Sequence, residues 1–305
     1  MATPTEMTET AQAPAPPSGR ELLLPLLAVF GAVLLWGGSF SVMKTIVADI
    51  GPIAVMWGRM AFAAAVLAAL LPRLGLGRIS KADLPALAVM ALCLPCLYFL
   101  CESNALLYTT SAQAGVIAST VPVWVAAGAW MFLGERLPGR AWWGMALSIA
   151  GVAWLTLAGE PDAGAPNPLL GNLLEVAAML CAAAYMIVCK RLSGHLGSVA
   201  LTAVQVGVGL VFFLPGAFGL LPRLGGLGLM PWLALAYLGV GVTLGAFALY
   251  NYAISRMPAS RASACINLVP VVAVVLGWLV LGEAMGPQQA AAAAAVLVGV
   301  WLSQR

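Results

Sequence analysis

The sequence has 305 residues, of which 62% are hydrophobic and only 8% charged, and its mean hydropathy is +1.00. So few charged groups cannot cover a surface in water, which excludes a water-soluble globular protein. The formal net charge of +3 does not imply a nucleic-acid partner. We therefore expect an integral membrane protein whose surroundings are the lipid bilayer.

Residues 1–20 are rich in Pro, Ala and Thr, which predicts a disordered tail without a secretory signal. After the tail, apolar runs long enough to cross a ~30 Å hydrocarbon core alternate with charged or Pro/Gly-rich breaks. Each run must be a helix, because unpaired backbone amides in lipid cost several kcal/mol, and none alternates as a barrel strand does. The ten predicted spans are 22–44, 52–71, 84–103, 112–133, 140–158, 169–188, 198–221, 231–253, 261–281 and 287–302.

An internal repeat divides these spans into two halves. Val-Pro-Val at 121–123 and Leu-Gly-Glu at 133–135 recur 148 residues later, at 269–271 and 281–283. A shared proline and a shared Leu-Gly-Glu at constant offset indicate a duplicated unit. The predicted all-α fold has four parts: a tail at 1–20, a five-helix repeat at 21–158, an outer linker at 159–168 and a second five-helix repeat at 169–305.

Basic residues predict the orientation of the helices in the membrane. A cytoplasmic amino terminus places most of them on the cytoplasmic side: Arg20, Arg73, Arg78, Lys81, Arg136, Arg140, Lys190, Arg191, Arg256, Arg261 and Arg305. Lys44 and Arg223 fall outside, so the positive-inside rule favours this orientation, with both termini cytoplasmic. Five spans per half then make the repeats inverted, as in secondary transporters that bind substrate near the midplane.

The paired halves, the Val-Pro-Val and Leu-Gly-Glu motifs and the Trp-Gly-Gly-Ser-Phe of residues 36–40 running on to Lys44 carry a family resemblance. The chain resembles the EamA-type branch of the drug/metabolite transporter superfamily over nearly its whole length after the tail. The resemblance implies an inner-membrane carrier of small molecules, with the amino-acid exporters as the expected branch. It implies no enzymatic activity, no cofactor and no metal.

Ionisable residues inside spans are candidate functional groups, because placing one in hydrocarbon costs at least ~2.5 kcal/mol. Glu102 in the third span could attract a substrate ammonium or carry a coupling proton, and a hydrated interfacial position is the alternative. Glu175 in the sixth span and Arg59 in the second are candidates for coupling or for an ion pair. Lys44 is expected to reach the outer headgroups.

The repeat itself points to a site. Ser119 and Asn267 occupy equivalent positions, three residues before Pro122 and Pro270. A proline inside a span removes a backbone hydrogen bond and breaks the helix, and paired broken helices mark the midplane site of inverted-repeat carriers. A kink required only for packing is the alternative.

Aromatic side chains well inside the spans could stack on an apolar or aromatic substrate, although helix packing is the alternative for each. We therefore predict that further residues join the substrate site: Trp36, Ser39, Tyr98, Trp124, Tyr185 and Tyr250.

The predicted function is export of amino acids, with hydrophobic or aromatic ones favoured, by alternating access. The alternative is a proton-coupled exporter of toxic cations, so protons are a candidate partner. Cys93 and Cys96 form a C-x-x-C motif that raises a thiol-disulfide oxidoreductase, but the pair lies in an apolar span without a basic neighbour. The substrate, the driving force and the oligomeric state stay open.

Overall fold

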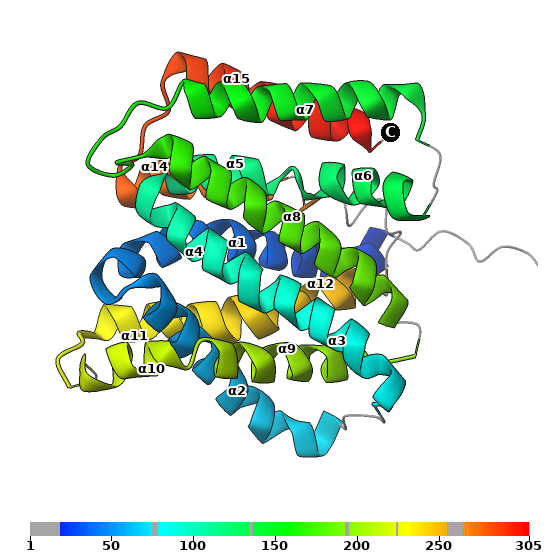
Figure 1. Cartoon of the computed structure of the whole chain (residues 1–305), viewed down its shortest axis with the longest axis vertical. Helices are drawn as coiled ribbons and strands as arrows, with labels where there is room; N and C mark the ends of the chain where they lie inside the picture. Colours follow the sequence, from blue (N-terminus) through cyan, green and yellow to red (C-terminus); the bar gives the residue numbers. More distant parts are fainter. Residues whose placement is uncertain are drawn as a thin grey trace, which may run out of the picture.

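The computed structural model describes residues 19–74, 79–133, 137–192, 195–223, 225–254, 256, 265–266 and 268–304. Over these residues the chain is helical, with turns and short connections and no strand. Figure 1 shows the helices stacked in layers with their axes roughly along one direction. The predicted all-α class is confirmed.

The first half contains nine helical elements: α1 (Gly19–Ile50), α2 (Pro52–Leu74), η1 (Lys81–Asp83), α3 (Leu84–Ala91), η2 (Leu92–Leu97), α4 (Tyr98–Tyr108), α5 (Ser111–Ala118), α6 (Val121–Leu133) and α7 (Gly139–Leu157). The second half contains α8 (Pro168–Leu192), α9 (Ser198–Phe212), α10 (Pro215–Leu220), η3 (Leu221–Arg223), α11 (Leu229–Ala236), η4 (Tyr237–Ala246), α12 (Phe247–Ile254), α14 (Val269–Leu281) and α15 (Pro287–Ser303).

Within the described residues, five continuous helical stretches are long and apolar enough to cross a bilayer: 23–50, 52–73, 81–108, 168–189 and 229–250. A sixth results if α9 and the α10–η3 segment, which meet at an angle of 58°, form one bent span. These correspond to the predicted first, second, third, sixth, eighth and seventh spans. The fourth, fifth, ninth and tenth are represented by shorter helices in the described residues, so the count of ten stays a prediction.

The fourth predicted span is broken, as its proline requires. α5 ends at Ala118 and α6 begins at Val121, with a turn at Ser119 and Thr120 between them. Pro122 has no N–H to continue the helical ladder. The hydroxyls of Ser119 and Thr120 bond back to carbonyls of their own helix, at 2.6 and 2.7 Å.

Two further breaks are not predicted by the sequence analysis. The third span contains the π-helical segment η2, where Leu94 has non-helical φ and ψ of −141° and 117° and precedes Pro95. The eighth span contains the π-helical segment η4. Shifted by the repeat offset of 148 residues, η2 falls inside η4. The two halves therefore share this irregularity, and π-helical turns are frequent at functional sites.

α7 and α15, the last helices of the two halves, form the most extensive helix–helix contact among the described elements (Figure 1). A Cβ added to Gly299 would lie 2.5 Å from the backbone nitrogen of Ser148, and one added to Gly151 would lie 2.8 Å from that of Val296. Small residues thus let the two backbones touch. Ser148 and Val296 are related by the repeat offset and are joined by a hydrogen bond of 3.1 Å, which indicates that a pseudo-twofold axis passes between them.

The two ends of the described chain lie on the same side of the bundle. In Figure 1, α1 begins and α15 ends at the right, where α2 and α8 also end and α7 begins. Arg73, Arg140 and Arg191 belong to these helix ends. The connection between α7 and α8, which carries Glu160 and Asp162, lies on the opposite side.

Candidate functional site

Arg59 is the first residue of a buried cluster of charged side chains. It lies on α2, is only 4% exposed, and its Nε donates a 2.8 Å hydrogen bond to the Thr243 hydroxyl of η4. Thr243 in turn donates to the carbonyl of Leu238 at 2.9 Å, across the five-residue spacing of a π-helix. The guanidinium carbon lies 4.1 Å from the ring centroid of Phe99, a favourable cation–π geometry. Arg59 therefore joins the first half to the second.

Glu102 is the second residue of the cluster, and a side chain of its own helix binds it. Tyr98, one turn earlier on α4, donates its hydroxyl to a Glu102 carboxylate oxygen at 2.5 Å. Glu102 is 4% exposed, so its side chain is buried within the protein. The positive charge of Arg59 attracts this carboxylate, although within the described residues the two form no direct ion pair.

Glu175 completes the cluster from α8, which packs most extensively against α4. Its side chain is completely buried, and neither carboxylate oxygen has a hydrogen-bond partner among the described residues. The charge that acts on it is that of Glu102, which has the same sign. The structure thus brings Arg59, Tyr98, Glu102 and Glu175 together at the boundary between the halves, at the level of the two π-helical segments.

Three of the other predicted site residues, Trp36, Ser39 and Tyr250, lie on α1 and α12. Trp36 packs against Tyr250 and Phe247, with ring centroids 5.5 Å apart in both pairs. The Ser39 hydroxyl donates to the carbonyl of Trp36 at 2.7 Å and so satisfies its own helix.

The broken fourth span holds a separate set of predicted residues. The Trp124 indole nitrogen donates to the Thr120 hydroxyl at 3.0 Å, which ties the two sides of the break together. Pro122 and Pro270 are each the second residue of their helix, α6 and α14. The Ser119 hydroxyl at this break is satisfied by its own helix, through the carbonyl of Val116. Asn267 lies outside the described residues.

Tyr185 lies in another region. It packs with Val188 and Cys189 against a cluster of buried leucines and Met90, formed by Leu87, Leu192, Leu196 and Leu201. Nearby, Gln205 of α9 donates to the carbonyl of Leu94, at the break in the third span, at 3.1 Å. Tyr185 is therefore not grouped with Glu102.

A polar contact that the sequence analysis missed surrounds Glu283. Its carboxylate accepts the backbone N–H groups of Ser111 and Ala112 at 2.9 and 3.1 Å and the Ser111 hydroxyl at 2.7 Å, which caps α5. Lys44 lies 3.6 Å from the same carboxylate and also donates to the carbonyls of Thr109 and Gly164. The expectation that Lys44 reaches the headgroups is corrected, since a carboxylate and two carbonyls hold it within the protein.

The repeat carried the signal for this contact. Leu281-Gly282-Glu283 ends α14 with a left-handed glycine, φ 67°, and the glutamate then folds back onto the neighbouring half. Only glycine adopts this conformation readily. The Leu-Gly-Glu motif is thus a helix stop followed by a cap for a broken helix, and its copy at 133–135 falls largely outside the described residues.

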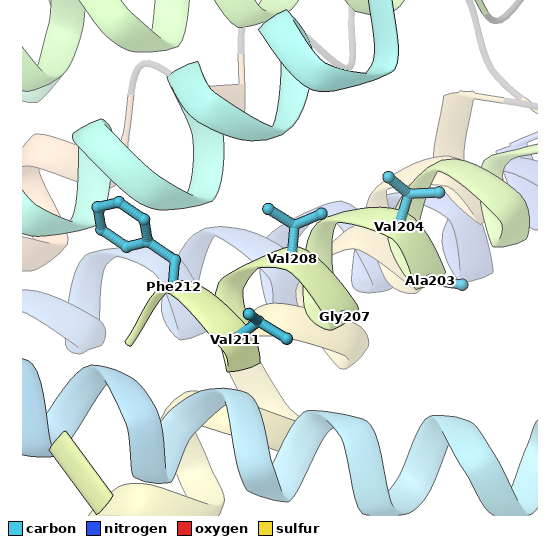
Figure 2. A pocket seen from close by; sticks show the side chains of 6 residues that line it. All are labelled: Ala203, Val204, Gly207, Val208, Val211 and Phe212. Atoms are coloured by element: carbon cyan, nitrogen blue, oxygen red, sulfur yellow. The ribbon is translucent and has the colours of Figure 1, made fainter. Parts of the chain in front are cut away.

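Two pockets in the described structure are lined by apolar residues, none of which belongs to the charged cluster. Figure 2 shows the larger, about 570 Å³, on one face of α9, where Val208, Val211 and Phe212 are exposed. The second, about 270 Å³, lies between α5, α14 and α15 and is lined by residues such as Val116 and Val274. Neither offers a polar group that could orient a polar solute.

Sequence comparison gives the architecture a family. The chain matches the EamA-like transporter family twice, over residues 23–157 and 169–304. It belongs to the EamA-like transporter family. The two matches cover the two halves separately, in agreement with the internal repeat, and the family consists of transporters rather than enzymes.

Relatives of this EamA-family chain are also named as transporters. An uncharacterized transporter, YetK of Bacillus subtilis, is 28% identical over 68% of this chain and 64% of its own length. YcxC, from the same organism, is 28% identical over 87% of both chains. A probable terminal-alkyne amino-acid exporter of Streptantibioticus cattleyicolor is 26% identical over 90% of this chain and 91% of its own.

A solved crystal structure shares the fold of this EamA-family chain. It covers 91% of this chain and 95% of its own, with a TM-score of 0.58 and 21% sequence identity. At that identity the similarity extends to the fold alone.

Proposed function

We propose that this EamA-family protein exports amino acids, with hydrophobic and aromatic ones favoured. The observation that carries the proposal is the buried cluster of Arg59, Tyr98, Glu102 and Glu175, which presents both signs of charge at the boundary between the halves. A zwitterion needs both signs. Arginine suits a carboxylate, and a carboxylate side chain suits an ammonium group.

Two further observations support this substrate class. Aromatic rings of Tyr98 and Phe99 border the charged groups, and a ring stacked on an apolar side chain adds affinity without a specific hydrogen bond. The relative from Streptantibioticus is named a probable exporter of an amino acid with a terminal alkyne, which is an apolar side chain.

The proposed mechanism is alternating access in the inner membrane. We take the chain to have ten spans in two inverted repeats, 21–158 and 169–305, joined by an outer linker at 159–168, with both termini cytoplasmic. The location of both described ends and of several arginines on one side of the bundle supports this orientation (Figure 1). Rocking of one half against the other would then expose the charged cluster to each side in turn.

A second candidate is an exporter of toxic cations, and Glu175 favours it. The cluster contains two buried acids and one buried arginine, whose charge acts on Glu102, so Glu175 can accept an additional positive charge without a substrate carboxylate. The two candidates differ in one requirement, because only the amino-acid exporter needs a carboxylate on its substrate.

Exchange in liposomes tests the proposal. Purified protein would be reconstituted with unlabelled L-phenylalanine inside and labelled L-phenylalanine, L-leucine or tetraphenylphosphonium outside. We expect saturable exchange of the amino acids, reduced at least about tenfold by Arg59→Gln, since a hydrogen bond to a charged group contributes about 1.5–3 kcal/mol. Arg191→Gln, at an exposed helix end, is the matched control and should leave exchange unchanged. Exchange of the phosphonium without any amino acid would favour the second candidate.

A further inference from the structure

The surroundings of Glu175 do not stabilise an ionised carboxylate. It is completely buried, and both of its oxygens lack a donor in the described structure. An isolated charge in a protein interior costs several kcal/mol, and each unsatisfied polar atom adds to that cost. In this arrangement the side chain is therefore the neutral acid, and its ionised form would need a cation beside it.

The surroundings of Glu175 offer no internal cation. The titratable groups that act on it come from α4 and are Tyr98, Cys101 and Glu102. Five other described elements pack against α8. Three of them, α3, α5 and α6, contain no titratable side chain. The segment η2 contains Cys93 and Cys96, and α7 contains only Arg140, in its first turn. Arg59 is directed to Glu102, Thr243 and Phe99. A positive charge at Glu175 must therefore come from outside the protein.

Glu102 differs from Glu175 although both acids are buried. It accepts the Tyr98 hydroxyl and lies in the field of Arg59, so its negative charge is offset within the protein. Only Glu175 lacks both kinds of partner. The asymmetry is not a consequence of the repeat, because the counterparts of Glu175 and Glu102 at the 148-residue offset are Leu27 and Tyr250.

We propose that Glu175 is the exchangeable cation site of the carrier: it holds a proton in the closed form and gives it up when the ammonium group of the exported amino acid enters between Glu175 and Glu102. In this step the carboxylic acid of Glu175 becomes a carboxylate, and its proton passes to water on the side to which the site is open. On the other side a proton from water displaces the ammonium group. This inference rests on the proposed function and deepens it from export to exchange of one proton for one amino acid.

Proton release on substrate binding tests the inference directly. Purified protein in a weakly buffered detergent solution with a pH indicator would receive L-phenylalanine, N-acetyl-L-phenylalanine or phenylethylamine. We expect the wild type to release up to one proton per chain with L-phenylalanine and none with the N-acetyl compound, which keeps the ring and carboxylate but has no ammonium group. Phenylethylamine, which has the ammonium group, should release a proton.

Three variants locate the source of the proton. Glu175→Gln should abolish the release, and Glu175→Asp should retain it, because the shorter side chain keeps the acid. Glu160→Gln makes the same chemical change in the exposed α7–α8 connection and should behave as the wild type. Equal release from Glu175→Gln and the wild type would overturn the assignment. If Glu175→Gln does not fold, infrared spectroscopy decides instead. Adding L-phenylalanine should remove the protonated-carboxyl band of the wild type, and Glu160→Gln should show the same loss. A band that persists in the wild type refutes the inference.

Transport separates failure of this inference from failure of the proposed function. In the same liposomes, an outward-directed proton gradient, with an acidic lumen, should drive accumulation of labelled L-phenylalanine in the lumen, up to about tenfold above equilibrium for one pH unit, the largest factor that one exchanged proton provides. Saturable exchange that ignores the gradient and releases no proton would refute the cation site and leave the amino-acid carrier standing. Absence of any amino-acid exchange would refute the carrier proposal itself.

Discussion

Arg59 keeps its charge inside an apolar bundle because three different interactions replace water. The Thr243 hydroxyl accepts from its Nε, the Phe99 ring lies 4.1 Å beneath the guanidinium, and Glu102 supplies the opposite charge. These partners come from η4 and α4, which are separated in sequence by more than a hundred residues. A buried cation is retained only when such partners are fixed by the fold around it.

Removing the Thr243 hydroxyl tests whether the buried Arg59 depends on this partner. Thr243→Val keeps the shape of the side chain but leaves the Arg59 Nε without its partner. We expect the free energy of unfolding in detergent to fall by about 1–3 kcal/mol and the apparent affinity for amino acid to weaken. Thr243→Ser retains the hydroxyl and should restore both. Thr45→Val, at an exposed hydroxyl on α1, is the matched control, and an equal loss there would remove the special role of Thr243.

At the scale of the element, irregular helices position the polar groups. η2 interrupts the third span just before Tyr98 and Glu102, and η4 interrupts the eighth at Thr243. α5 begins inside the bundle at Ser111, after the short connection from α4, and Glu283 caps its N-terminus. A carboxylate at that position is favoured because the N-terminal amides of a helix point at it and the helix dipole attracts negative charge.

The Glu283 cap predicts a measurable coupling with Lys44. Glu283→Ala should lower the free energy of unfolding by about 1–3 kcal/mol, since it removes a cap and leaves amides of α5 unpaired. Lys44→Met should cost less in the Glu283→Ala background than in the wild type, because the pair at 3.6 Å is then already broken. A double-mutant cycle of urea or thermal unfolding in detergent measures this. Strict additivity would show that the two side chains act independently.

At the scale of the whole molecule, the most extensive contact between the duplicated halves, among the described elements, is that of α7 with α15. The reciprocal approach of Gly151 to Val296 and of Gly299 to Ser148 places related residues of α7 and α15 around a common axis. Helices that touch through their backbones slide poorly, so we expect this pair to act as the fixed element while the helices around the charged cluster move.

The inverted arrangement predicts opposite locations for two points of the chain. A reporter enzyme active only outside the cytoplasm should be active when fused after Gly164 and inactive when fused after Arg305, because an odd number of spans separates them. A second reporter active only in the cytoplasm should give the reverse pattern. The same side for both fusions would contradict the inverted repeats, whatever the number of spans.

Several features could be predicted from the sequence because they depend on local composition. The membrane class, the two repeats and the helix break before Pro122 follow from hydrophobic length, a repeated motif and the missing N–H of proline. The breaks at η2 and η4 had weaker signals, Pro95 in one half and the Gly239, Gly241 and Gly245 series in the other. Since glycine also serves close packing, its presence alone did not predict a π-helical segment.

The sequence by itself determined that this chain is a duplicated, helical membrane protein of a transporter family, because a bilayer constrains each segment separately. Only the tertiary structure decided which polar residues meet. It joined Arg59 to Thr243 and Lys44 to Glu283, separated Tyr185 from Glu102, and left Glu175 without a partner. These outcomes depend on the packing of helices far apart in sequence, and in an apolar interior the presence or absence of one partner changes the free energy of a charge by several kcal/mol.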